Sequence, residues 1–496
     1  MKRRHFLQLG LGAATAMPLQ RALARDAKSG FADQPARSLE GAEMILRGRD
    51  VQALAASISG GVLLPGAEGY DAARMMWNGT FDRRPALIAR CRNASDVRHA
   101  VDFARESRIL TAVRAGGHSQ SGKSVCNSGL VIDVSPMQGV RVDPQRKIAY
   151  LKSGSLLGLL DAETSKYSLV TTAGTVSHTG AAGLTLGGGF GRVGRRFGLT
   201  CDNVRAVEIV TANGRKRRAS AQQNADLYWG VRGGGGNFGV VTEFEYQLHD
   251  MDPVILGGAI IWPVEQLRDV LNFHAGFLQT LPDEMNVDLF VTTIPNGPRV
   301  VGIEACWGAD RQRGEAMLAP LINLGKPMVN RIGPMRYVDL QRSLDAVNPH
   351  GARHYAKSGF LPQLNEQVLD TLVSAIAADS TGRLHVVLQA TGGAINRVPV
   401  AATAFPNRNA AVWLMLFADS PAPQADAECR AIVRAAWKPI EPLTSGYYTN
   451  AIVDDETEAQ LRANFGANYD RMAVIKAKYD PLNLFRLNAN VLPRAS

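Results

Sequence analysis

Cysteine is scarce in this chain, and its spacing follows no functional pattern. The 496 residues include five cysteines, an odd number that forms no C-x-x-C pair. A disulfide framework usually needs an even set at regular spacings, and common zinc sites need close cysteine or histidine pairs. The sequence therefore predicts no metal site. It leaves open one disulfide in an oxidising periplasm, for which no pair can be chosen, and most of the thiols are expected to be buried. The cysteines are Cys91, Cys126, Cys201, Cys306 and Cys429.

Long apolar runs are also missing, so no stable membrane span is expected. The apolar stretch at residues 7–19 is too short to cross a bilayer and contains Pro18 and several glycines. The Arg3 and Arg4 pair before it resembles the twin-arginine export consensus, and residues 22–24 fit an A-x-A cleavage site. We therefore expect residues 1–24 to be a signal peptide. The twin-arginine export machinery would then deliver the folded protein to the periplasm or outside the cell.

Basic runs interleaved with aromatic residues are absent, which leaves nucleic-acid binding without support. The formal net charge is +10, but part of this charge falls in the expected signal peptide. With 46% hydrophobic and 20% charged residues, the composition is that of a globular protein of two or three domains. Glycine, at 49 residues, is above average and concentrates in loops.

The first glycine loop comes directly after residues 109–113, an apolar and β-branched stretch that is expected to be a strand. Paired glycines let the backbone approach a ligand closely and leave successive N–H groups free to converge on an anion. A histidine directly after such a turn lies at the edge of any ligand that the two glycines bind. The loop consists of Arg114, Ala115, Gly116, Gly117, His118, Ser119, Gln120, Ser121 and Gly122.

A second glycine array occupies residues 173–191. Two loops of close approach in one domain indicate a long ligand with two ends, such as a dinucleotide. Gly189, Gly191 and Gly194 also have the G-x-G-x-x-G spacing of a Rossmann fingerprint. That motif needs a hydrophobic strand before it and a helix after it, whereas here glycines precede it and Gly198 interrupts the segment after it. The Rossmann interpretation is therefore rejected.

These loops and the C-terminal segment resemble the berberine-bridge-enzyme-like branch of the flavin oxidases built on the vanillyl-alcohol-oxidase, or PCMH-type, FAD-binding fold. The resemblance rests on the R-A-G-G-H-S motif at residues 114–119, the L-G-G-G-F-G motif at residues 186–191 and the tail from Tyr447, and Trp77-Asn78 matches the family's W-N pair. It runs from about residue 63 to the C-terminus, with a weak middle third.

The resemblance implies that FAD is bound covalently, from a ring nitrogen of His118 to the 8α carbon of the flavin. In the family this bond raises the flavin's redox potential and keeps an exported enzyme from losing its cofactor. Many relatives add a second bond from a cysteine, but that position is Val176 here, so a single bond is expected.

The resemblance also implies which other residues contact FAD. Residues 239–241, after a run of four glycines, would pack the far end of the cofactor, and Asn488 or Asn490 would lie near the flavin. The implied set is Arg114, Ala115, Gly116, Gly117, His118, Ser119, Gln120, Gly122, Gly174, Thr175, Thr179, Gly180, Gly183, Gly239, Val240, Val241, Asn488 and Asn490.

The implied fold is α+β: a PCMH-type FAD-binding domain of two subdomains, and a substrate domain in which helices cover an antiparallel sheet. Alternating apolar patterns between residues 287 and 418 support the sheet. The polar, irregular residues 25–46 predict no regular structure. We place a lead-in at residues 25–60, the FAD-binding domain at 61–252, the substrate domain at 253–440 and a berberine-bridge-like segment that returns to the first domain at 441–496.

Flavin oxidation needs a substrate C–H bond pointed at the flavin and a base for the adjoining proton. Tyr448 matches the family's Y-x-N pattern in the tail, so it is the candidate base, with packing as its alternative role. The strand position that is Glu or Gln in plant relatives is Leu416 here, so that acid is missing. His385 and Gln389 are fallback candidates, although a structural role in the sheet is the simpler interpretation for each.

The residue that gates oxygen in the family corresponds to Thr179, which is no longer than valine and therefore predicts access of O2. We expect an FAD-dependent oxidase that takes a hydride from a C–H bond of a small organic or carbohydrate substrate and forms H2O2. A dehydrogenase with another electron acceptor, and a flavin-bearing redox or binding protein, are the alternatives. The sequence does not identify the substrate.

Overall fold

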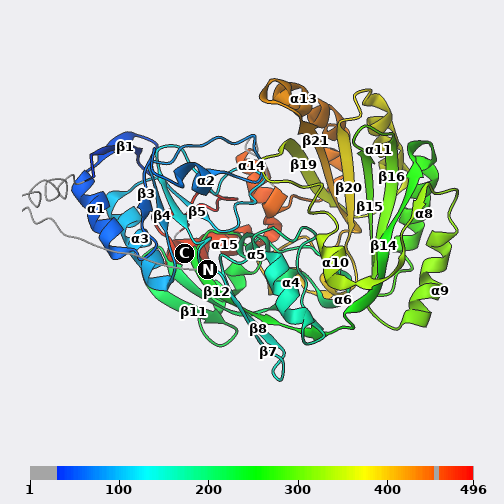
Figure 1. The fold of residues 1–496 in the computed structure, drawn as a ribbon, viewed down its shortest axis with the longest axis horizontal. Coiled ribbons are helices and arrows are strands. Elements are labelled where there is room, and N and C mark those ends of the chain that lie inside the picture. Colours follow the sequence, from blue (N-terminus) through cyan, green and yellow to red (C-terminus); the bar gives the residue numbers. More distant parts are fainter. Residues whose placement is uncertain (1–30, 452–456, 495–496) are drawn as a thin grey trace, which may run out of the picture.

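The computed structural model describes residues 31–451 and 457–494, so the expected signal peptide lies outside the described residues. Two lobes lie side by side (Figure 1): the elements up to β12 (Gly239–Gln247) form the first, and those from β14 (Val254–Pro263) to β21 (Val412–Ser420) form the second. The C-terminal helix α15 (Tyr469–Tyr479) returns to the first lobe. The fold is the expected α+β arrangement.

The first lobe contains two larger sheets. One has the order β3-β4-β6-β5, in which β4, β6 and β5 are parallel and β3 is antiparallel to β4. The other is antiparallel, with the order β11-β10-β12-β8-β7. The strands are β3 (Val62–Leu63), β4 (Leu87–Arg90), β5 (Thr111–Arg114), β6 (Leu130–Asp133), β7 (Val140–Asp143), β8 (Ile148–Lys152), β10 (Val204–Thr211) and β11 (Lys216–Ser220). β5 ends at the first glycine loop, as the sequence predicted.

The prediction of an irregular N-terminal lead-in was wrong for residues 34–46. They form an antiparallel hairpin of β1 (Gln34–Arg37) and β2 (Glu43–Leu46), with Gly41 in its turn at φ +88°. The N–H of Leu110 donates to the carbonyl oxygen of Arg37, and Leu39 is buried in the core of the first sheet. The sequence of this hairpin contains few apolar residues, so no strand pattern is visible in it. Its pairing with the chain before β5 supplies the stabilising contacts instead.

The second lobe is built on an antiparallel sheet with the order β17-β14-β16-β15-β20-β21-β19, to which β18 adds at β14. Apolar side chains of one face form a core with four helices, because successive side chains of a strand point to opposite faces. Its other strands are β15 (Met285–Thr293), β16 (Arg299–Trp307), β17 (Val329–Asn330), β18 (Gly333–Arg336), β19 (Arg353–Leu361) and β20 (Leu384–Ala390). The four helices are α8 (Leu267–Leu278), α9 (Arg311–Ile322), α11 (Glu366–Ala378) and α13 (Asp426–Trp437).

These four helices leave the opposite face of the sheet directed toward the first lobe (Figure 1). None of the helices in the described parts of the chain is long and apolar enough to cross a membrane. Two short strands, β9 (Leu169–Val170) and β13 (His249–Asp250), pair with each other. The remaining helices are α1 (Gly48–Ser57), α2 (Tyr70–Arg74), α3 (Ala94–Ser107), α4 (Leu157–Ser165), α5 (Ala181–Leu186), α6 (Gly194–Phe197), α7 (Ala225–Val231), α10 (Tyr337–Arg342), α12 (Ala394–Arg397) and α14 (Glu458–Ala463).

A buried lysine fixes the C-terminal tail to the first lobe. Nζ of Lys476 donates to the carboxylate of Asp480 at 2.7 Å and to the carbonyl oxygens of Asn237 and Phe485 at 2.8 and 2.9 Å. Both ionic side chains are fully buried. Removing one partner of a buried ion pair leaves the other charge without compensation, which costs more than the pair itself contributes.

We expect Lys476→Met to lower the free energy of unfolding by about 3–5 kcal/mol, because the Asp480 carboxylate would remain buried and unpaired. Thermal denaturation followed by circular dichroism measures the change. Lys478→Met is the matched control: Lys478 is 60% exposed and pairs with Asp226 at 2.6 Å, so its loss should cost under about 1 kcal/mol. Equal melting shifts for the two variants would contradict the proposed role of the buried pair.

Candidate active site

The two glycine loops lie against each other. A Cβ atom added to Gly116 would lie 2.4 Å from Cα of Gly180, and one added to Gly180 would lie 2.6 Å from the backbone nitrogen of Gly116. Cβ contacts this short require a shift of backbone, so both positions need glycine for packing as well as for any ligand. The loops therefore form one unit, with the histidine of the first loop at its edge.

We expect Gly116→Ala to abolish most FAD binding, because the added methyl group would force the two loops apart. Overpacking of this kind costs about 1–3 kcal/mol, and each 1.4 kcal/mol is about tenfold in affinity. The flavin absorbance per mole of purified protein measures the loss. Gly276→Ala in α8, where an added Cβ meets no atom within 4 Å, is the control and should retain full flavin content. Full flavin content in Gly116→Ala would disprove the packing argument.

The imidazole of His118 stacks on the indole of Trp77. Their ring centroids are 4.1 Å apart and their planes differ by 14°. Nε2 of His118 is buried and has no hydrogen-bond partner among the described residues. Burial, and then the nearby rings of His178, His350 and His354, lower the pKa of His118 to about 3. The ring is therefore neutral near pH 7, the state in which a ring nitrogen can act as a nucleophile.

Side chains of the second lobe hold the second glycine loop. Nε2 of Gln341 donates to the carbonyl oxygen of Gly174 at 2.9 Å. The backbone N–H of Ser177 donates to Asp345 at 2.8 Å, and the Ser177 hydroxyl also donates to that carboxylate. The position of this loop therefore depends on contacts that only the folded second lobe provides.

Arg192 links the same loop to the large sheet. Its buried guanidinium donates from Nε to Glu304 on β16 at 2.6 Å and from Nη1 to the carbonyl oxygen of Thr175 at 3.1 Å. The side chain of Arg192 is fully buried, and that of Glu304 is 13% exposed. This ion pair joins the two lobes directly beside the glycine loops.

The site fits a large polar cofactor. Buried polar groups in proteins normally have hydrogen-bond partners, yet four predicted cofactor residues carry buried polar atoms with none among the described residues. An added Cβ at Gly183 would meet no atom within 4 Å, so glycine leaves open space beside the second loop. The four atoms are Nε of Arg114, Nε2 of His118, Oδ1 of Asn488 and Oδ1 of Asn490.

Other predicted residues of the first loop shape its backbone. Gly117 and Gly122 have φ values of +68° and +66°, a region that favours glycine. Oγ of Ser119 accepts a hydrogen bond from the backbone N–H of residue 123 at 3.2 Å. Oε1 of Gln120 lies 3.2 Å from Nε2 of His354 on β19. Ala115 packs between the cores of the two sheets of the first lobe.

The predicted residues at the far end of the cofactor are placed differently. Val240 and Val241 are 1% and 4% exposed and belong to the cores, so only their backbone can face a ligand. Gly239 pairs with β10 at the start of β12. Nζ of Lys123 donates to the carbonyl oxygen of Asn488 at 3.1 Å, which places the tail beside the first loop.

Tyr448 lies in an aromatic cluster beside the second glycine loop. Its Oη accepts hydrogen bonds from the N–H of Gly189 at 3.0 Å and from Nδ2 of Asn450 at 2.9 Å. Burial raises the pKa of Tyr448 to about 12, although both donors would stabilise a negative charge on the oxygen. Its role as a base stays a prediction, because the cluster also suits packing. The neighbouring rings are Phe190, Phe360, Phe405 and Trp413.

The face of the large sheet opposite its helices is partly open. Leu416, the position of the acid or amide in plant relatives, lies in the helix-covered core instead, with no exposed surface. Strand register explains this, since Met415 and Phe417 on either side point to the other face. The partly exposed residues of that face are Asp288, Phe290, Thr292, Val387, Gln389, Met415 and Phe417.

This partly open face has an apolar middle and polar ends. By strand register both fallback candidates lie on this face: Gln389 is partly exposed, whereas His385 is buried, stacks on Phe417 and has its Nδ1 2.8 Å from the hydroxyl oxygen of Thr292. Burial lowers the pKa of His385 to about 4, so its ring is neutral near pH 7. Burial raises the pKa of Asp288 to about 6. The face can therefore present both an apolar surface and hydrogen-bonding groups to a small molecule.

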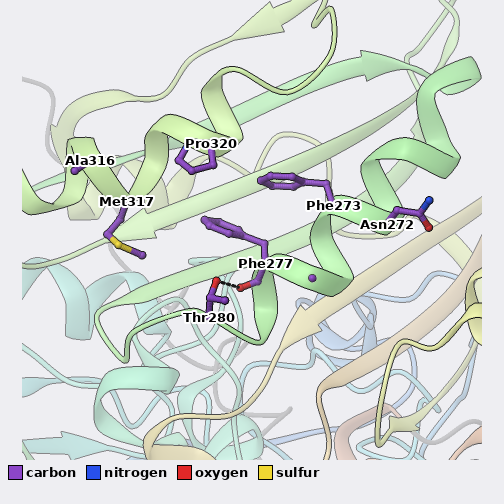
Figure 2. A pocket seen from close by; sticks show the side chains of 8 residues that line it. Asn272, Phe273, Phe277, Thr280, Ala316, Met317 and Pro320 are labelled. Atoms are coloured by element: carbon purple, nitrogen blue, oxygen red, sulfur yellow. Dashed lines mark hydrogen bonds between the residues drawn. The ribbon is translucent and has the colours of Figure 1, made fainter.

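A separate surface pocket of about 500 Å³ lies between α8 and α9 (Figure 2). Phe273, Phe277, Met317 and Pro320 supply its apolar walls, and Figure 2 shows the two phenylalanine rings side by side along α8. Because α8 and α9 cover the face of the sheet that is directed away from the glycine loops, this pocket is not part of the candidate active site.

Metal-binding side chains do not cluster in the part of the chain that the structure describes, where no group of His, Cys, Asp or Glu is arranged to hold an ion. All five cysteines are buried and free, and no disulfide pairs them. Burial raises the pKa of each of these thiols, so they stay protonated near pH 7 and act as small apolar groups in the cores.

The residues that sequence reasoning missed are those that surround His118. Trp77 was noted only as part of a family motif, and no role was predicted for His178, His350 or His354. These residues come from separate segments of the chain. The one available signal was the W-N pair itself. It lies before β4, and nothing in the local sequence explains why an aromatic ring is needed there, which could have indicated a distant contact.

Comparisons with known proteins agree with this geometry. A family model described as FAD binding domain matches residues 85–220, and one described as berberine and berberine like matches residues 447–492. An FAD-linked oxidoreductase of Dictyostelium discoideum is 32% identical over 443 residues, which cover 88% of this chain and 95% of that protein. The (R)-6-hydroxynicotine oxidase of Paenarthrobacter nicotinovorans is 29% identical over 469 residues, covering 89% and 98%.

Solved structures show the same fold. The 6-hydroxy-D-nicotine oxidase of Arthrobacter nicotinovorans has a TM-score of 0.81 at 28% identity and covers 88% of this chain and 99% of its own. A chitooligosaccharide oxidase has a TM-score of 0.82 at 23% identity, covering 90% and 100%, and supports the fold alone. Fold and site define an FAD-dependent oxidoreductase. The chain belongs to the FAD-linked oxidases with a PCMH-type FAD-binding domain and a berberine-bridge-like C-terminal segment.

Proposed function

We propose that this enzyme is an exported oxidase that binds FAD covalently through His118 and oxidises a C–H bond of a small organic or carbohydrate molecule. The bound flavin supplies the chemistry, because it accepts a hydride equivalent and passes two electrons to O2, which becomes H2O2. The observation that carries the proposal is the position of His118: its ring stacks on Trp77 beside the two contacting glycine loops, and its Nε2 is buried without a partner among the described residues. Burial lowers the pKa of this ring, which is consistent with a neutral imidazole near pH 7.

The residues of the chain divide the remaining work. The first and second loops and the tail would bind the cofactor, with the unpartnered atoms of Arg114, Asn488 and Asn490 as its hydrogen-bonding partners. The open face of the large sheet would orient the substrate against the flavin. Tyr448 would take the adjoining proton in its phenolate form, which the two N–H donors at its oxygen stabilise but burial on balance disfavours near pH 7.

Access of oxygen depends on the second loop. Thr179 of the second loop is partly exposed. Its N–H donates to the carbonyl oxygen of Val176 at 3.1 Å, a turn that fixes the backbone from which the short side chain projects. A β-branched residue of this size leaves space that a longer one would fill. We therefore assign O2 as the electron acceptor. Turnover that requires an artificial acceptor and forms no H2O2 in air would identify a dehydrogenase instead.

An anaerobic substrate screen is the most informative test. Purified enzyme is mixed with cyclic amines, including (R)-6-hydroxynicotine because a relative is named for it, and with alcohols and sugars. A substrate bleaches the flavin band at about 450 nm, and admission of air should restore the band and release one H2O2 for each reduced flavin. If no compound in a broad panel reduces the flavin, the binding or redox-partner function is favoured.

Export can be tested separately. The Arg3 and Arg4 pair and the A-x-A site at residues 22–24 support a twin-arginine signal peptide. The full-length chain expressed in a host with a twin-arginine system should appear outside the cytoplasm with its mature N-terminus near residue 25. Replacement of both arginines by lysine should retain it in the cytoplasm, and unchanged export of that variant would exclude this route.

A further inference from the structure

Trp77 lies between two histidines that come from different lobes. One face of its indole stacks on His118 at 4.1 Å, and His354 of β19 packs against it with a centroid distance of 4.2 Å and an interplanar angle of 54°. Trp77 is 6% exposed. The predicted attachment residue is thus covered by a rigid aromatic ring that is itself supported by the second lobe.

Three hydrogen bonds with two other segments fix Trp77 in this position. Its backbone N–H donates to the carbonyl oxygen of Gly117 at 2.9 Å, directly beside His118. Its indole Nε1 donates to the carbonyl oxygen of Asn348 at 3.0 Å, and its own carbonyl oxygen accepts from Gly351 at 2.9 Å. The last two partners belong to the loop before β19, so the indole cannot turn away from His118 while the second lobe is in place.

We propose that Trp77 is a positioning residue for flavin attachment: it fixes the plane of the His118 imidazole and shields the ring from water, so that folding of the second lobe completes the attachment site. The inference rests on the proposed covalent bond to His118 and adds a residue to that site. Stacking on Trp77 restricts rotation of the His118 ring about its Cβ–Cγ bond. Without that restriction the ring nitrogen would turn away from the position in which it can bond to the flavin.

Attachment itself is an oxidation of the methyl group. One C–H bond at the 8α carbon and one N–H bond of the imidazole break as the N–C bond forms. The two electrons and two hydrogens reduce the flavin, and O2 reoxidises it with release of H2O2. Trp77 takes part in no bond change, and its contribution is to hold a neutral imidazole in the reacting orientation.

The shielding has a measurable signature in the pH dependence of attachment. His118 is faced by His178 of the second loop and by His350 and His354 of the second lobe, and no carboxylate is among the main causes of its pKa shift. Arg114 of the first loop acts on the neighbouring His350, whose pKa it helps to lower. Burial is the largest cause of its low pKa. Opening one face of the ring to water should raise that pKa toward its ordinary value, so a neutral nucleophile would be lost as the pH falls.

The experiment uses full-length apoprotein incubated with FAD in air. Flavin that stays with acid-precipitated protein, divided by all protein-bound flavin, gives the covalent share over time. Wild type should attach FAD at the same rate across the pH range. For Trp77→Leu, a return of the His118 pKa to about 6.5 leaves about a tenth of the rings neutral at about pH 5.5, so attachment should be about tenfold slower there than at about pH 8.

Two further variants separate positioning from general stability. Trp77→Phe keeps an aromatic ring that can stack on His118 and loses the Nε1 hydrogen bond and part of the ring area, so it should restore a flat pH profile. Trp229→Leu removes a tryptophan of similar burial, 4% exposed, from the same lobe and should leave the profile unchanged. The covalent share is divided by the flavin that folded protein has bound, so unfolded molecules, which bind no flavin, do not change it. A loss of folding therefore does not imitate slower attachment.

The outcomes are distinct. A slower and pH-dependent attachment in Trp77→Leu alone supports the inference. Covalent flavin in wild type together with a wild-type rate and a flat profile in Trp77→Leu would overturn it and leave the bond to His118 intact. Wild type that holds FAD only non-covalently would overturn the proposed bond and, with it, this role of Trp77.

Discussion

His118→Ala should fold and bind FAD, but none of its flavin should remain with acid-precipitated protein. The glycine loops, the tail and the unpartnered polar atoms of Arg114, Asn488 and Asn490 are unchanged in this variant, so non-covalent binding is expected to persist. The neutral ring nitrogen at the loop junction is lost, and with it the bond to the 8α carbon. Because that bond raises the flavin potential in the family, reduction by substrate should also become slower.

Mass spectrometry of a tryptic digest locates the bond directly. In wild type we expect the mass of FAD on the peptide that contains His118 and on no other peptide. His350→Asn is a suitable control, since His350 belongs to the same group of rings but is exposed, and it should keep covalent flavin. An unmodified His118 peptide from yellow protein would contradict the predicted linkage.

Tyr448→Phe should reduce the flavin with substrate about 10²–10⁴ times more slowly than wild type, which is the usual contribution of a positioned base. The variant removes only the hydroxyl oxygen that accepts hydrogen bonds from Gly189 and Asn450. Because burial raises the pKa of Tyr448 to about 12, the phenolate fraction increases with pH, and the wild-type rate should rise as the pH rises toward that value. Anaerobic stopped-flow measurement of flavin reduction gives both results.

The control for this prediction is another buried tyrosine of the first lobe. Tyr246 is fully buried, and its hydroxyl lies 2.7 Å from that of Thr185, away from the aromatic cluster. Tyr246→Phe should change stability and leave the rate of flavin reduction unaltered. An unchanged rate in Tyr448→Phe would assign Tyr448 to packing of the cluster, and Gln389 or Asp288 on the open sheet face would then be tested next.

Local patterns were sufficient for much of the fold. A β-branched run followed by Gly116-Gly117 marks the end of β5 because strand and turn preferences act within a few residues. Alternation within β15, β20 and β21 predicted an antiparallel sheet with one buried face. Local patterns failed at residues 34–46, where pairing with a distant segment stabilises a hairpin whose own sequence is polar.

The side on which each strand residue lies depended on register. Leu416 corresponds to an acid or amide in plant relatives, yet it lies in the helix-covered core while Met415 and Phe417 face the first lobe. A shift of one residue in pairing exchanges the two faces of a strand. The sequence alone could therefore name the strand but not the side chains that it presents to a substrate.

The sequence by itself determined the class of cofactor site, because glycines and a histidine at fixed spacing act through the local backbone. Only the tertiary structure placed Trp77, His178, His350 and His354 around His118 and joined the second loop to Arg192 and Gln341. These contacts are long-range, since each partner comes from a different segment and sometimes a different lobe. Burial is the largest cause of the low pKa of His118, and the second lobe contributes to the surroundings of that ring through His350, which lies against it, and His354, which packs against Trp77.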